Sequence, residues 1–86
     1  MVKSQDCITS GSKTNNLEYY TINTYDNYSF CGIVGYWCMT SAKVNVISLY
    51  PAADGIRVCV TWQTVDGSTV TDNKIKVFVL YVYQSS

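Results

Sequence analysis

Apolar and polar residues alternate along much of the chain with the period of two that a β-strand produces. The clearest stretch is 56–63, in which every second residue is large and apolar: Ile56, Val58, Val60 and Trp62. This pattern predicts a strand with one buried face, and it places Cys59 on the opposite face.

Other segments show weaker forms of the same pattern. Residues 17–25 favour a partly exposed strand, because apolar and polar side chains fall on both of its faces. Residues 28–39 are apolar on both faces, which is typical of a buried central strand. Residues 43–50 alternate with a slip after Val46, which predicts a β-bulge that returns the apolar residues to the core. Residues 74–83 must also be central, since an exposed run of this character would aggregate.

Turn-forming residues separate these segments. Asp26-Asn27 predicts one turn, and 50–55 predicts another because it contains Pro and Asp-Gly. The strongest turn signal is Asp66-Gly67, which favours a two-residue hairpin that pairs 62–64 with 69–71, ahead of the last strand at 74–83. The first residues, 1–16, are polar and predict an irregular arm or a short edge strand.

Composition supports a β fold, because Val, Ile and Thr supply 26 of the 86 residues while Ala and Leu supply three each. We therefore predict a single all-β domain over 1–86, a small antiparallel β-sandwich or barrel of six to seven strands. A folded chain of this length buries roughly 60 to 65% of its surface, near the lower end for independent folding. Additional stabilisation is therefore expected.

Four cysteines, Cys7, Cys31, Cys38 and Cys59, are the candidates for that stabilisation. No two of them have the two-residue separation of a zinc knuckle, so no metal site is expected. We predict two disulfides and an oxidising compartment, with buried reduced thiols as the alternative. Three connectivities are possible, of which we prefer Cys7 with Cys31 and Cys38 with Cys59.

The predicted disulfides imply a secreted protein. Residues 1–6 contain no apolar leader core, so the expectation is a mature form from which a leader has been removed. The longest apolar run, 77–83, is too short to span a membrane as a helix, and no membrane insertion is expected.

Charge and side-chain chemistry exclude several classes of function. Six basic and six acidic residues give no net charge, which argues against nucleic-acid binding. The chain has no His, the commonest general base and metal ligand, and its carboxylates are scattered among turn residues. We expect neither an enzyme nor a bound cofactor.

A cluster of aromatic residues is the one candidate binding feature. Tyr19, Tyr20, Tyr25 and Tyr28 lie close together among Asn and Thr, a composition typical of recognition surfaces. The alternative is that these rings fill cross-strand pairs on a half-exposed sheet. Asn27 begins an Asn-Tyr-Ser glycosylation sequon at a predicted turn and is a candidate modification site.

These features lead to three hypotheses of function. The first is a secreted, disulfide-stabilised binding module of effector, toxin or inhibitor type that recognises a protein partner without catalysis. The second is a structural subunit of a self-assembling particle, coat or fibre, which would pair through its C-terminal strand. The third is a carbohydrate-binding domain that uses the same four tyrosines. The partner and the oligomeric state are left open.

Overall fold

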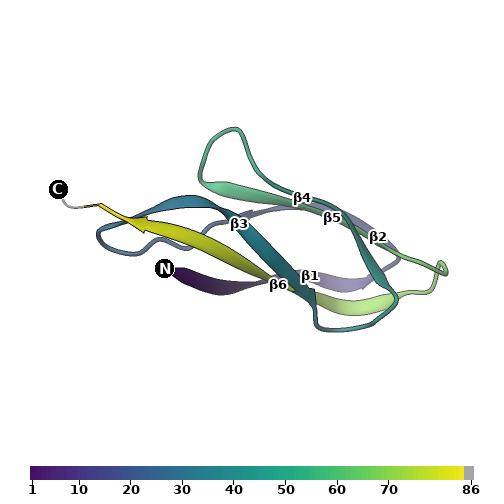
Figure 1. Ribbon diagram of the computed structural model, residues 1–86. Coiled ribbons are helices and arrows are strands. Elements are labelled where there is room, and N and C mark those ends of the chain that lie inside the picture. Colours follow the sequence, from purple (N-terminus) through teal and green to yellow (C-terminus); the bar gives the residue numbers. More distant parts are fainter. Residues whose placement is uncertain (85–86) are drawn as a thin grey trace.

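A computed structural model describes residues 1–84, and all regular secondary structure in this part of the chain is β-strand. The strands form two three-stranded antiparallel sheets that pack face to face (Figure 1). In chain order they are β1 (Val2–Lys13), β2 (Asn15–Thr21), β3 (Tyr28–Cys38), β4 (Val44–Pro51), β5 (Arg57–Thr64) and β6 (Val70–Tyr83).

Sheet A has the strand order β1-β6-β3, and sheet B has the order β2-β5-β4. Four of the five connections cross from one sheet to the other, and only β4 and β5 are neighbours both in the chain and in a sheet. Thr14 alone separates β1 from β2, and its carbonyl accepts a hydrogen bond from the Thr64 amide at 2.9 Å. One long strand therefore changes sheets at Thr14.

The inner faces of the two sheets enclose one hydrophobic core. Its centre consists of alternate residues from the two central strands: Val58, Val60 and Trp62 of β5, and Ile75, Val77 and Val79 of β6. Because successive side chains of a strand point to opposite faces, every second residue of these strands reaches the core.

Several features expected from the sequence are confirmed. The fold is all-β with six strands in two antiparallel sheets, and β6 is the central strand of sheet A. The register of β4 shifts between Val46 and Ser48, as the slip in its alternation predicted. Ile47 is the bulged residue and is 54% exposed, so the bulge keeps Val46 but not Ile47 against the core.

The expectations for β3 and β1 need correction. The segment expected to be a buried central strand forms β3, which is an edge strand of sheet A. The N-terminal segment is an edge strand, as one of the two alternatives expected, but it is not short, because β1 has 12 residues and pairs with β6. Two edge strands flank β6, so it is paired on both sides over the stretch from Ile75 to Leu80.

The predicted hairpin between β5 and β6 is also wrong. These strands belong to different sheets, and the segment between them crosses the sandwich instead of reversing within one sheet. The local turn chemistry is nevertheless present: Gly67 has a φ of 76°, and Asp66 Oδ1 accepts hydrogen bonds from the amide and hydroxyl of Ser68. Asp-Gly therefore forms a turn without determining which strands pair.

No disulfide forms, and all four cysteines are free thiols, which corrects both predicted pairs. Cys7 and Cys38 both lie opposite Ile75, one on each side of β6. Two strand spacings separate them, about 10 Å, whereas Cα atoms of a disulfide lie within about 7 Å. Cys31 is exposed at a β3 register shift, and Cys59 lies in sheet B.

Candidate functional site

The four tyrosines predicted to bind a partner do not form one surface. Tyr19 is on the outer face of sheet B and is exposed, whereas Tyr20 points inward, with its hydroxyl 3.2 Å from Thr9 Oγ1. Burial raises the pKa of Tyr20 to about 12. Tyr19 and Tyr20 therefore lie on opposite faces of β2.

The other two tyrosines pack against aromatic residues near the end of β6. The Tyr25 ring meets that of Tyr81 edge-on, with centroids 5.0 Å apart, and the Tyr28 ring meets that of Tyr83 at 5.5 Å. Such edge-to-face pairs stabilise the fold. The rings of Tyr25 and Tyr28 therefore make contacts within the chain, which leaves less of each ring for a partner.

Tyr19 belongs to a row of side chains across the outer face of sheet B. It lies opposite Cys59 on β5, which in turn lies opposite Tyr50 on β4. The Arg57 guanidinium sits 4.7 Å from the centre of the Tyr19 ring. Contact with the Cys59 thiol raises the pKa of Tyr50. Cys59 is fully buried although it faces outward, as expected for a small side chain flanked by two aromatic rings.

The outer face of sheet A carries apolar side chains from its central strand, β6. The outward residues of β6 are Lys74 and Lys76 toward one end and apolar residues toward the other, whereas the outward residues of β5 are largely polar. We define the apolar face as five side chains on the outer side of sheet A, of which three are exposed and two are half-buried: Val2, Trp37 and Val82, with Phe78 and Leu80.

Trp37 is the most exposed aromatic residue of the apolar face, with 66% of its surface accessible. Gly32 lies opposite Leu80 and Gly35 lies opposite Phe78, so the β3 residue directly opposite each of them has no side chain. Sequence reasoning missed this surface. The signal was present in the apolar residues on both faces of this segment, which were interpreted as marks of a buried strand. The register of β3 shifts at Gly32 and Gly35, where the glycines were expected to mark a bulge or bend.

A charged group borders the apolar face. Trp37 lies opposite Lys76, and both Lys74 and Lys76 place their ammonium groups 3.9 Å from the carboxylate of Asp6. Since one carboxylate faces two ammonium groups, this border is slightly basic.

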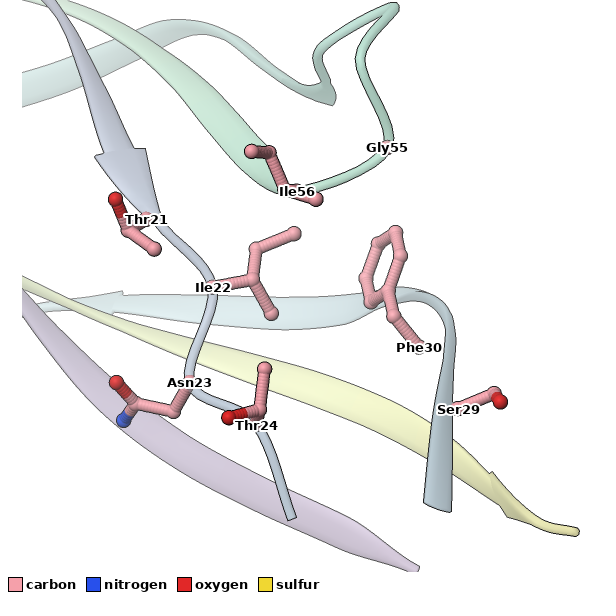
Figure 2. A pocket seen from close by; sticks show the side chains of 8 residues that line it. All are labelled: Thr21, Ile22, Asn23, Thr24, Ser29, Phe30, Gly55 and Ile56. Atoms are coloured by element: carbon pink, nitrogen blue, oxygen red, sulfur yellow. The ribbon is translucent and has the colours of Figure 1, made fainter. Parts of the chain in front are cut away.

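A pocket of about 560 Å³ opens at the end of the sandwich where β2 ends and β5 begins. We call it the end pocket. Figure 2 shows Ile22 between Ile56 and the ring of Phe30. The remaining lining residues are polar or glycine: Thr21, Asn23, Thr24, Ser29 and Gly55.

The remaining candidate residues offer little reactive chemistry. Burial raises the pKa of the Cys7 thiol to about 11, with smaller contributions from the charges of Asp6 and Glu18, and burial also raises the pKa of Cys38. Thiols with raised pKa values are poor nucleophiles at neutral pH. Asn27, the glycosylation candidate, is exposed in the turn before β3 with a φ of 67°.

Residues 1–84 contain no group of three or more side chains arranged to hold a metal ion. Over the same residues there is no helix long and apolar enough to cross a membrane. Comparison with known protein families, with curated proteins and with solved structures finds no significant match.

Proposed function

We propose that this protein is a non-catalytic binding module that recognises a protein partner through the apolar face of sheet A. One observation carries the proposal: β6, a central strand, presents Phe78, Leu80 and Val82 on the outer side of its sheet. Such a face is usually solvated and polar in an antiparallel sandwich. Apolar side chains grouped on the outer face of a small domain are typical of an interaction site.

The composition of the apolar face supports a protein as the partner. Trp37 is large, rigid and exposed, and Trp is enriched among the residues that dominate interface affinity. Asp6 and the two lysines beside it form a polar rim of the kind that surrounds an apolar interface centre. We therefore expect the partner surface to be mainly apolar.

The four free thiols remove the argument for secretion, which depended on disulfides. The proposal accordingly names no compartment. The proposed contact residues are those of the apolar face and not the four tyrosines, which face different directions. A carbohydrate site that needs these tyrosines together has no supporting arrangement in the chain.

The proposal is tested by comparing two double variants in affinity capture from an extract of the source cells. Trp37→Ser with Val82→Ser changes the apolar face, and Leu17→Ser with Ile47→Ser changes exposed apolar residues of sheet B as a matched control. We expect a partner that is retained by the wild type and the control but lost by the apolar-face variant. Equal retention by all three folded proteins would remove the proposal.

A structural subunit of an assembly is the second candidate. The observation in its favour is β3, an edge strand of 11 residues with no charged side chain to oppose pairing with another copy. The C-terminal strand expected to pair between subunits is instead central in its own sheet. Sedimentation over a range of concentrations tests this candidate, and a monomer throughout would eliminate it.

A further inference from the structure

The end pocket lies where the two sheets differ in length. β6 has 14 residues and β5 has eight, so sheet A continues past the end of sheet B. The segments before β3 and before β5 cover the inner face of sheet A there, and the pocket opens between them (Figure 2). A hollow at this position follows from the strand lengths.

We propose that the end pocket binds a small, neutral and mainly apolar molecule. This site is separate from the apolar face and goes beyond the protein-binding function proposed above. Its size fits the proposal, because small-molecule sites commonly measure about 300 to 1,000 Å³ and a cavity of about 150 Å³ accepts benzene. A volume of about 560 Å³ therefore accommodates two fused rings with room for a substituent.

The lining determines the chemical class of the ligand. Ile22, Phe30 and Ile56 supply the apolar contacts, and none of the eight lining residues is charged. A charged group placed there would lose hydration without gaining a counter-ion. The other lining side chains are polar but uncharged: Thr21, Asn23, Thr24 and Ser29.

Hydrogen bonds hold the wall formed by residues 21–24. The Ile22 amide donates to the Ile56 carbonyl at 2.9 Å. The Gln5 side chain donates to the Thr21 carbonyl and accepts from the Asn23 amide, both at 3.0 Å. The Tyr81 hydroxyl donates to the Asn23 carbonyl at 2.6 Å. This wall is therefore fixed by sheet A and does not need to be ordered by the ligand.

The neighbouring wall, at Gly55 and Ile56, is held by a turn before β5. Asp54 Oδ1 accepts from the Ile56 amide at 3.0 Å, and Asp54 Oδ2 accepts from Arg57 Nε at 2.6 Å. The Ala52 amide also donates to the Arg57 carbonyl at 2.8 Å. Both charges of this turn are paired with one another. A preformed pocket loses less conformational entropy on binding, which favours affinity.

The test uses 2-naphthol as the neutral probe and naphthalene-2-sulfonate as a charged probe with the same rings. Each is titrated into ¹⁵N-labelled protein, and amide chemical shifts are followed. We expect saturable shifts at the lining residues with 2-naphthol and at least about tenfold weaker binding of the sulfonate. Shifts that do not saturate, or equal affinity for the two probes, would overturn the proposal.

Two exposed isoleucines provide a matched pair of variants. Ile56→Ala removes a wall of the pocket, whereas Ile47→Ala makes the same change at the β4 bulge; the two side chains are 62% and 54% exposed. We expect Ile56→Ala to weaken 2-naphthol binding by about five- to tenfold and Ile47→Ala to leave it unchanged. Thr24→Trp, which fills the pocket, should abolish binding.

Shifts centred on Trp37 and Phe78 would instead assign the probe to the apolar face and count against the end pocket. Equal loss of binding in Ile56→Ala and Ile47→Ala would do the same. Neither Trp37 nor Val82 lines the end pocket, so the effect of the apolar-face double variant on partner capture and the effect of Ile56→Ala on probe binding are independent results.

Discussion

Trp62 and Thr9 connect the two sheets through the core: the indole Nε1 of Trp62 in β5 donates a hydrogen bond to Thr9 Oγ1 in β1 at 3.1 Å. Both residues are only 1% exposed. The same hydroxyl lies 3.3 Å from Asn16 Nδ2 and 3.2 Å from the Tyr20 hydroxyl. The hydroxyl oxygen of Thr9 in sheet A is therefore hydrogen-bonded to three polar groups of sheet B.

Replacing Thr9 with Val should destabilise the protein by about 2 kcal/mol, because the change keeps the shape but leaves the buried Trp62 N–H without its acceptor. Urea unfolding followed by Trp fluorescence measures the difference. The control is Thr61→Val on the outer face of β5, which should change stability by less than about 0.5 kcal/mol. Equal effects of the two substitutions would show that the Trp62 hydrogen bond contributes nothing specific.

Replacing Asn73 should have the opposite effect on stability from replacing Thr9. It lies opposite Thr9 and is 1% exposed, and within residues 1–84 neither its amide nitrogen nor its amide oxygen has a hydrogen-bond partner. An unpaired buried amide lowers stability, so Asn73→Leu should raise the free energy of unfolding by about 1 kcal/mol. Exposed Asn45 provides the matched Asn→Leu control. A loss of stability in Asn73→Leu would mean that the amide is hydrogen-bonded in solution.

The free cysteines predict a definite pattern of thiol labelling. In the native protein a thiol reagent should modify exposed Cys31 first, Cys38 more slowly, and buried Cys7 and Cys59 only after unfolding. Intact mass should be the same before and after reduction. A gain of about four hydrogens on reduction would instead restore the two disulfides.

Stability should fall at alkaline pH. The pKa of Cys7 is raised from its ordinary value of 9.0 to about 11, mainly by burial. Above pH 9 the unfolded chain releases this proton while the folded chain keeps it, so the stabilisation present below pH 9 is lost as the pH rises toward 11. Unfolding titrations across this range measure the slope, and Cys7→Ala should make it shallower. An unchanged slope would assign the loss to other groups, such as Tyr20.

Much of the strand pattern was predictable because each prediction depended on neighbouring residues alone. The alternation in β5 placed Val58, Val60 and Trp62 on the core face, and the slip after Val46 located the bulge in β4. A period of two directly reports which face each side chain occupies.

The candidate sites were less predictable because they depend on which elements become neighbours. The end pocket joins Ile22, Phe30 and Ile56 from three separate segments, and no local pattern relates them. The apolar face was concealed for a different reason. Apolar residues on both sides of β3 are compatible with a buried central strand and equally with an edge strand that presents a binding surface.

The amino-acid sequence was sufficient for the fold class, the central position of β6 and the places where turns occur, since alternation and turn chemistry act over a few residues. Tertiary packing set the pairing partners, the separation of the four thiols and the surfaces left uncovered. Asp66-Gly67 shows the difference: its backbone reverses the chain locally, but burial of β5 and β6 in a shared core placed these strands in opposite sheets.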